Sequence, residues 1–300
     1  IVGAIVGFGA VAVGIDAVNW PKVLQISLSW ITSPLLAGVI AFAIFHLIRS
    51  TILNKSNPVH QIRKYGPAFF FFVFFIIGLV TLFKGLKHIN LDLDLMEALA
   101  GSVALGLIGS GLGAFFIRRV QIGEADPDHR FDQVERIFVV LQILTACAIA
   151  FAHGSNDVAN AVGPLAAVVS ILKDGTVAMK VAMPPWILAL GGACIVLGLL
   201  IWGRRVMETV GNKITEITPS RGFCATFGAA TVVLICSKMG LPISTTHTLV
   251  GSIIGVGLAR GIPTLNLGII KEIVMSWFAT VPFTALISAV LFKIMLLTLG

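Results

Sequence analysis

Charged residues are scarce in this sequence: Asp, Glu, Lys and Arg make up 12% of its 300 residues, while 57% are hydrophobic. A soluble domain carries about 25% charged residues, because a surface that faces water needs them. This scarcity excludes a water-soluble globular domain. Apolar runs of about 20 residues, the length that crosses a bilayer as a helix, instead repeat along the chain.

Signatures of several enzyme classes are also missing. The sequence contains no GxSxG, Walker A or HExxH motif, so it gives no support for a hydrolase or an ATPase. The four cysteines form no CxxC pair, which gives no support for a disulfide or a metal site. The apolar runs are continuous rather than alternating, which excludes a β-barrel. We therefore expect neither an enzyme nor a resident cofactor.

The apolar runs predict an all-α polytopic membrane protein. Basic residues gather in short loops beside these runs, so the net charge of +7 indicates membrane topology rather than a nucleic-acid surface, and we expect a plasma (cell inner) membrane location. The segments predicted to be helical in the membrane are 1–14, 23–48, 69–83, 95–117, a helix from Asp126-Pro127 through Phe151, a short helix to Leu172, 185–202, 223–236, a glycine-rich helix to Leu258, and 269–297.

Two distant parts of the chain repeat each other. The run IVGAIVGFG at residues 1–9 matches LVGSIIGVG at 249–257, and SWITSP at 29–34 resembles SWFATVP at 276–282. We divide the chain into the remainder of a first repeat at 1–117, a charged central loop at 118–136, and a second repeat at 137–300. The second copy follows PISTTH, whose counterpart would end just before Ile1, so we expect an N-terminally incomplete chain that lacks half of a two-fold site.

The first polar motif, HGSNDVANA, occupies residues 153–161 inside an apolar stretch. Gly154 predicts that the helix breaks at residues 153–157, which would let this stretch cap the helix that follows. An ionised Asp157 in a membrane costs about 2.5–3.5 kcal/mol or more, so a cation, a proton or a partner must balance it. The candidate cation ligands are Asp157, Asn160, Asn156 and Ser155, with sodium at Asp157 and Asn160. The alternative is a purely structural cap.

The second polar motif, PISTTH, occupies residues 242–247. Pro242 would end one helix, and Ser244 or Thr245 would cap the next. The start of a helix offers free N–H groups and a partial positive charge, which favour an anion. The candidate anion ligands are Ser244, Thr245, Thr246 and Asn156. The alternative is an ordinary Ser/Thr cap.

HGSNDVANAVGP and PISTTHTLVGSIIGVGL resemble the motifs of the inorganic phosphate transporter (PiT) family, as do IVGAIVGFG and VNWPKVLQISLSWITSPLLAG. The resemblance implies two inverted repeats with broken or re-entrant helices. It also implies symport of inorganic phosphate with sodium ions or protons, with both motifs contributing to the site. We expect a secondary active transporter in which sodium is favoured over protons, in the lipid bilayer, and a homodimer is one form it could take.

Three other functions remain open at this point. A sulfate or other oxyanion permease could share the architecture. A channel would need a continuous polar stripe through the spans, and none is visible in the sequence. A membrane enzyme would need a nucleophile and a base, for which only His247 near Ser244 comes close. The choice between sodium ions and protons is also open, because a carboxylate suits both.

Overall fold

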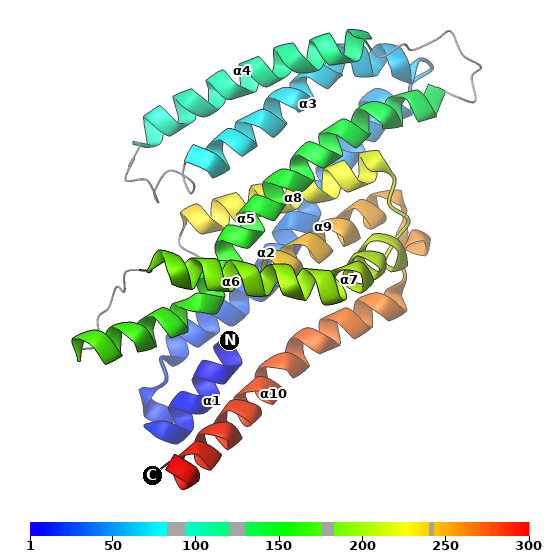
Figure 1. Cartoon of the computed structure of the whole chain (residues 1–300). Helices are drawn as coiled ribbons and strands as arrows, with labels where there is room; N and C mark the ends of the chain where they lie inside the picture. Colours follow the sequence, from blue (N-terminus) through cyan, green and yellow to red (C-terminus); the bar gives the residue numbers. More distant parts are fainter. Residues whose placement is uncertain (83–93, 120–129, 176–182, 240–242, 300) are drawn as a thin grey trace. The chain divides into compact units, whose positions relative to one another are not determined.

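The structure is a computed structural model, and it describes residues 1–82, 94–119, 130–175, 183–239 and 243–299. The described residues form helices joined by short turns, with no strand among them (Figure 1). Seven of these helices are long and apolar enough to cross a membrane. The predicted all-α polytopic class is therefore confirmed.

The order of elements follows the chain in Figure 1. The helices are α1 (Val2–Ala12), η1 (Ile15–Ala17), α2 (Trp20–Ile48), η2 (Arg49–Leu53), α3 (Pro58–Val80), α4 (Leu95–Arg119), α5 (Arg130–Asp174), α6 (Pro185–Gly198), η6 (Leu199–Gly203), α7 (Arg204–Glu208), η7 (Thr209–Lys213), α8 (Pro219–Lys238), α9 (Thr245–Arg260), η8 (Ile262–Thr264) and α10 (Leu267–Leu299).

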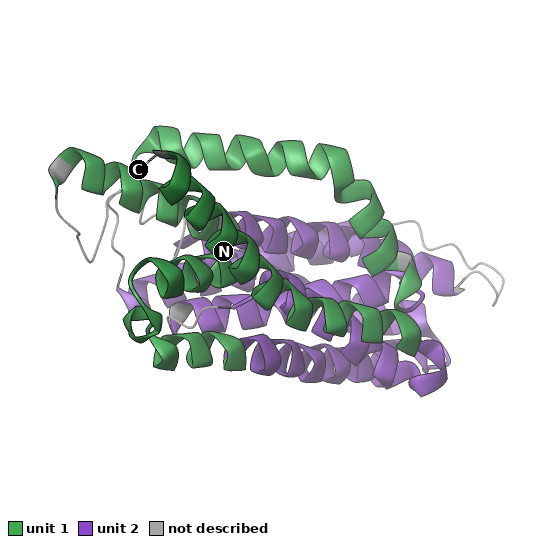
Figure 2. Ribbon diagram, turned by 90° about the horizontal axis from the view of Figure 1, so that it is seen from below, with its two compact units in different colours: residues 1–28, 156–214, 266–300 green, residues 29–155, 215–265 purple. Residues whose placement is uncertain are grey.

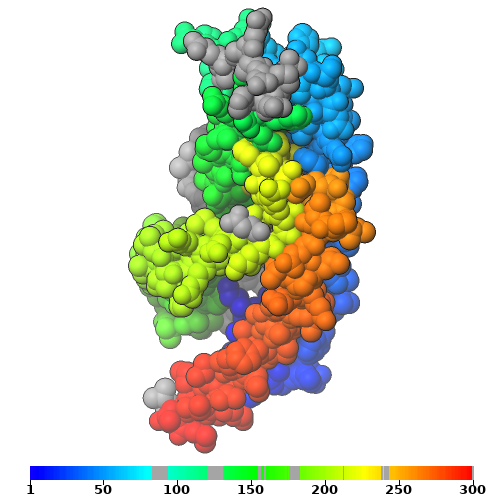
Figure 3. All heavy atoms as spheres, turned by 90° about the vertical axis from the view of Figure 1, so that its right-hand side faces the viewer, coloured from blue at the N-terminus to red at the C-terminus, as the bar shows by residue number. Residues whose placement is uncertain are grey.

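The helices gather into two compact units, coloured separately in Figure 2. The first unit holds residues 1–28, 156–214 and 266–300, and the second holds residues 29–155 and 215–265. Helix α10, in orange and red in Figure 3, keeps its apolar side chains exposed along its length, with none of its candidate span buried. Such a surface is suited to lipid rather than to water.

Glycine on α4 lets this helix pack closely along α3 in the second unit. A methyl group at Gly106, Gly109 or Gly113 would collide with a phenylalanine of α3, whereas Gly111 faces open space. Membrane helices pack in this way because lipid supplies no hydrophobic drive between them. The three glycines that face α3 therefore allow the close packing of the two helices.

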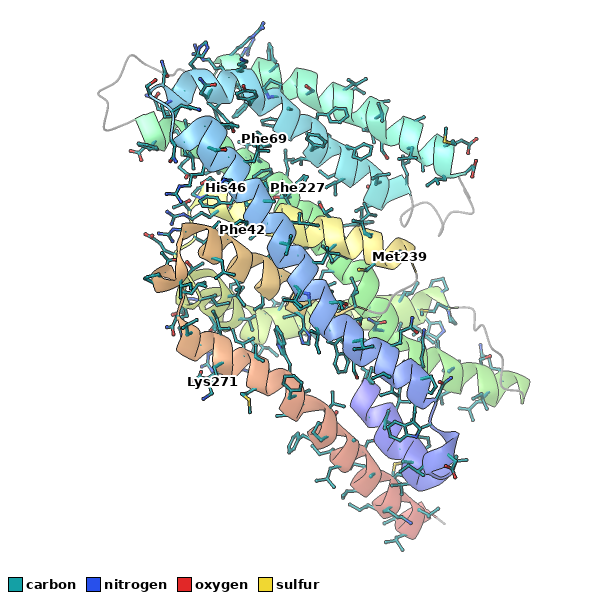
Figure 4. All side chains as sticks on the ribbon, turned by 180° about the vertical axis from the view of Figure 1, so that it is seen from behind. Phe42, His46, Phe69, Phe227, Met239 and Lys271 are labelled. Carbon is teal, nitrogen blue, oxygen red and sulfur yellow. The ribbon has the colours of Figure 1, made fainter. Side chains whose placement is uncertain are left out.

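Aromatic side chains fill the centre of the second unit. The ring of Phe223 on α8 lies 5.7 Å from Phe138 on α5, 6.0 Å from Phe69 on α3 and 5.6 Å from Phe227. Figure 4 labels Phe69 and Phe227. Phe138 and Phe223 are almost completely buried, so this cluster joins three helices at one point. Ring pairs at these distances stabilise beyond their buried area.

The two repeat copies share an unusual turn. Gly14 and Gly261 both adopt φ of +119°, and each is followed at once by a 3-10 turn, η1 or η8. The next long helix is then capped in the same way: Asn19 accepts the N–H of Lys22, and Asn266 accepts the N–H of Ile269. The repeat detected in the sequence is therefore also present in the local backbone. The inverted relation between the copies stays a prediction.

Helix α3 extends beyond the membrane segment predicted at 69–83. It begins at Pro58, with the side chain of Asn57 accepting the N–H of His60 at 3.0 Å. Asn followed by Pro is a strong start signal, because the amide caps the helix and proline fits its first position. The predicted start at Asp126-Pro127 lies outside the described residues, and α5 is described from Arg130.

The expectation at the first polar motif was wrong. The predicted break at residues 153–157 is absent, because α5 continues as one helix of 45 residues through it. Asp157 and its neighbours therefore lie within a helix and do not cap one. Gly154 costs a helix about 1 kcal/mol, whereas backbone groups left unpaired in lipid cost several kcal/mol each. The second predicted break is confirmed, since α8 ends at Lys238 and α9 begins at Thr245.

Candidate functional site

The start of α9 forms the more sharply defined half of the candidate site. Ser244 is the N-cap, and its hydroxyl accepts the backbone N–H of His247 at 3.3 Å. The hydroxyl of Thr248 donates to the carbonyl of Ser244 at 2.8 Å. Thr245 is 3% exposed, whereas Thr246 is exposed. The predicted cap is confirmed at Ser244, and the first turn carries hydroxyls in both buried and open settings.

Helix α9 is held against α2 in the second unit by backbone contact. A methyl group at Gly251 would collide with the backbone of Pro34, and one at Gly255 would collide with Gly38. A methyl group at Gly38 would in turn lie 2.9 Å from the carbonyl oxygen of Gly251. The two helices thus approach without intervening side chains. This contact brings the helix that begins at the Ser244–Thr246 turn close to α2.

The first unit contains a similar contact made by the other repeat copy. A methyl group at Gly3 of α1 would collide with the Val281 backbone and Thr284 of α10, and one at Gly7 would collide with Ala285. Gly3 and Gly7 are the repeat counterparts of Gly251 and Gly255. Each short helix therefore packs on the long helix of the other copy, close to the proline inside that helix.

The opposite end of α9 is held by charged groups. Glu216 pairs with Arg260 at 3.4 Å and with Arg221 at 3.2 Å. Arg49, after the end of α2, donates to the carbonyl of Ala259 at 3.2 Å. Arginines at a helix C-terminus interact favourably with its dipole. Both ends of α9 are therefore tied down, which limits its movement within the second unit.

The carboxylate of the first motif lies on α5 in the first unit. Asp157 is half-buried and Asn160 is exposed, and the two share one face of the helix because they are three residues apart. Pro164 has no N–H, so the carbonyl of Asn160 loses its helical partner and can face a ligand. The side chains of Ser155 and Asn156 lie outside the described residues. Asp157, Asn160 and this carbonyl provide oxygen ligands of the kind that a hard cation prefers.

Helix α6 packs against the other side of this part of α5. A methyl group at Gly191 of α6 would collide with Val162 of α5, and Ile187 packs with Val162 and Ala166 in one buried cluster. The Asp157 segment is therefore backed by a packed apolar layer. Its partner motif at Ser244–Thr246 belongs to the second unit, and the joint pocket that the sequence predicts stays a prediction.

Sequence reasoning missed the junction between α5 and α8, the helices that lead to the two motifs. Glu135 of α5 accepts hydrogen bonds from Ser220 of α8, and Thr145 shares a hydrogen bond of 2.7 Å with Thr226. A methyl group at Gly222 would collide with Gln142. The only sequence signal is polar residues recurring on one face of α5 within an apolar run.

Comparisons with known proteins agree with one another. The sequence model described as "Phosphate transporter family" matches residues 1–288. A protein of Haemophilus influenzae named "Putative phosphate permease" is 45% identical over 98% of this chain and 70% of its own length. A protein of Pyrococcus abyssi, also named a "Putative phosphate permease", is 46% identical over 98% of this chain and 71% of its own length.

A solved structure is also similar. The chain described as "The sodium-dependent phosphate transporter" superposes with a TM-score of 0.88 at 42% sequence identity, and the match covers 99% of this chain and 72% of that one. The match extends over nearly the whole chain. It therefore includes the segments that carry both polar motifs.

Proposed function

This chain belongs to the phosphate transporter family, and we propose that it carries inorganic phosphate across the membrane by symport with sodium ions. It is an integral, multi-pass membrane protein and a transporter rather than an enzyme. Phosphate transport follows from the family. The sodium coupling and the assignment of residues are the proposal, and they rest on the chemistry of the two motifs.

The start of α9 supplies the phosphate ligands. The first N–H groups of a helix have no partner within the helix, and they carry about half a unit of positive charge between them. Ser244, Thr245 and Thr246 add hydroxyls at the same place, and the proposal also includes the amide of Asn156. Neither motif contains Arg or Lys. Dipoles and co-bound cations therefore hold the anion, which lets it leave once the cations leave.

The Asp157 segment supplies the cation ligands. Asp157 and Asn160 present a carboxylate and an amide on one face of α5, with Asn156 and Ser155 beside them in the sequence. Sodium suits oxygen ligands. The similar structure is described as sodium-dependent, and this description of a relative favours sodium over protons. One sodium ion at Asp157 offsets the carboxylate, and further cations bound with phosphate offset the charge of the anion, so phosphate does not cross lipid uncompensated.

Alternating access completes the mechanism. In secondary transporters with internal repeats, one part of the fold rocks against another around a fixed site. We propose that phosphate and its cations bind together before this movement, because phosphate without them would carry uncompensated charge into the lipid. Coupling then arises from the charge balance. It requires no covalent step.

The observation that carries the proposal is the capped start of α9, with Thr245 almost completely buried in an otherwise apolar protein. Labelled phosphate uptake into proteoliposomes, with sodium and pH gradients imposed separately, tests it. Uptake should follow the sodium gradient at constant pH. Uptake driven by the pH gradient alone would refute sodium coupling, and no phosphate uptake under either gradient would refute the transport function itself.

A variant tests the role of the carboxylate. Asp157→Asn keeps the shape of the side chain but removes its charge, so sodium-driven uptake should be abolished while the protein stays folded. Asp16→Asn makes the same chemical change at an exposed residue of η1 and should transport normally. Normal sodium-driven uptake by Asp157→Asn would rule out Asp157 as the cation ligand.

A further inference from the structure

The contact between α2 and α9 keeps one register over three successive turns. His247 lies against Trp30, Gly251 against Pro34, and Gly255 against Gly38. The sequence separation is the same for each pair (247 − 30, 251 − 34 and 255 − 38 all equal 217). The helices therefore run in the same direction, and His247 is the first contact of the series. The two later positions on α9 are glycine, so His247 is the one large side chain among the three.

The imidazole of His247 meets Trp30 in two ways. Its ring lies 6.2 Å from the indole ring at an interplanar angle of 76°, an edge-on arrangement. It also hydrogen-bonds the backbone of Trp30. A histidine in this place thus connects the first turn of α9 to a specific point on α2, whereas the glycine contacts only bring the two backbones close.

Proline explains why the backbone of Trp30 can accept this bond. In an α-helix the carbonyl of residue 30 accepts the N–H of residue 34. Residue 34 is proline, which has no N–H, and α2 continues through it. The carbonyl of Trp30 is therefore left without its helical donor in an apolar setting. An imidazole N–H from α9 satisfies it, which removes the cost of an unpaired buried acceptor.

The first turn of α9 is internally rigid, because Ser244 accepts the N–H of His247 while Thr248 donates back to the carbonyl of Ser244. We propose that His247 is a positioning residue for phosphate. By donating to the Trp30 carbonyl, which Pro34 leaves without a helical donor, His247 fixes the position of the Ser244–Thr246 turn along the axis of α2. This inference rests on the proposed function. It assigns to His247 no direct contact with phosphate and no proton transfer.

Two substitutions at His247 separate positioning from packing. His247→Leu keeps bulk beside Trp30 but removes the donor, and it should raise the KM for phosphate about tenfold, the scale on which one lost hydrogen bond acts. His247→Gln retains an N–H donor and should restore most of this loss. The measurement is sodium-driven phosphate uptake in proteoliposomes, normalised to folded protein. A merely structural role would instead lower the amount of folded protein at unchanged KM.

A double-mutant cycle tests the role of proline. Pro34→Ala returns an N–H to residue 34, so the carbonyl of Trp30 regains its helical donor and depends less on His247. His247→Leu should therefore raise KM less in the Pro34→Ala background than in the wild type. Pro67→Ala removes a proline from the interior of α3 and serves as the matched control, with the full effect of His247→Leu expected in its background.

The outcomes are distinct. An unchanged KM in folded His247→Leu overturns the positioning role, and equal effects in the Pro34→Ala and wild-type backgrounds overturn the link to the proline-freed carbonyl. If His247→Leu does not fold, the variants His247→Gln and Pro34→Ala decide. A normal KM in His247→Gln with a raised KM in Pro34→Ala supports the link, because Pro34→Ala gives the Trp30 carbonyl another donor and so weakens its bond to His247. A raised KM in His247→Gln or a normal KM in Pro34→Ala overturns the link. Failure of the wild type to take up phosphate would instead refute the proposed function.

Discussion

The carboxylate of Glu135 on α5 accepts two hydrogen bonds from Ser220, the second residue of α8. One comes from the backbone N–H and one from the hydroxyl, each at a distance of 2.7 Å. Ser220 is 1% exposed, so water cannot replace this acceptor. A carboxylate at a helix N-terminus satisfies a free N–H and faces the positive end of the dipole. Glu135 therefore joins the helices that lead to the two polar motifs.

Removal of this carboxylate should destabilise the protein. Glu135→Ala leaves the N–H of Ser220 without an acceptor, at a cost of about 1–3 kcal/mol, while its hydroxyl keeps the hydroxyl of Thr218 as a partner at 3.2 Å. We expect a lower apparent melting temperature in detergent, measured by loss of the monodisperse peak in size-exclusion chromatography after heating. Glu272→Ala changes an exposed carboxylate of α10 and should leave the melting temperature unchanged. Equal melting of the Glu135 variant and the wild type would show that the junction contributes nothing.

Close packing of α9 on α2 makes a second prediction. Gly251→Ala places a methyl group against the backbone of Pro34, which cannot move aside as a flexible side chain would. Overpacking of this kind typically costs about 1–3 kcal/mol, and a backbone clash belongs at the upper end. Gly111→Ala, at a helix position with open space, is the control and should melt like the wild type. The yield and the melting temperature of both variants are measured in detergent. A Gly251→Ala protein as stable as the control would contradict the backbone contact between α9 and α2.

A third prediction concerns the two turns at Gly14 and Gly261. Both residues have φ of +119°, a conformation that side chains rarely adopt, and neither has a close neighbour that a methyl group would strike. Alanine at either position should therefore cost about 1–3 kcal/mol through the backbone alone. Gly198→Ala, in a helix with open space, is the reference. Similar losses of thermal stability at the two turns are expected, and a loss at only one would argue against their equivalence.

The sequence predicts what depends on local pattern. The span at residues 95–117 appears as α4 (Leu95–Arg119), and Ser244 caps α9 as expected, because hydrophobicity and capping are both short-range signals. The repeat was also visible, since glycines that permit backbone contact recur at a fixed offset. These features need no knowledge of which helices become neighbours.

Long-range partners could not be predicted in the same way. Glu135 finds Ser220 85 residues further along the chain, and nothing near either residue indicates the other. The prediction of a break at residues 153–157 was wrong for a related reason. Glycine and polar residues are compatible with either a break or a continuous helix, and packing against the rest of the protein determines which one forms. Packing in three dimensions settles such choices, and a linear pattern does not contain it.

The exchange of short helices between the repeat copies has a consequence for how the chain is assembled. Helix α1 rests on α10 and α9 rests on α2, so each short helix packs on a long helix that is far from it in the sequence. The glycine face of α1 stays unmatched in the membrane until α10 has been synthesised and inserted. A truncation that removed α10 would therefore leave α1 without the helix that it packs on.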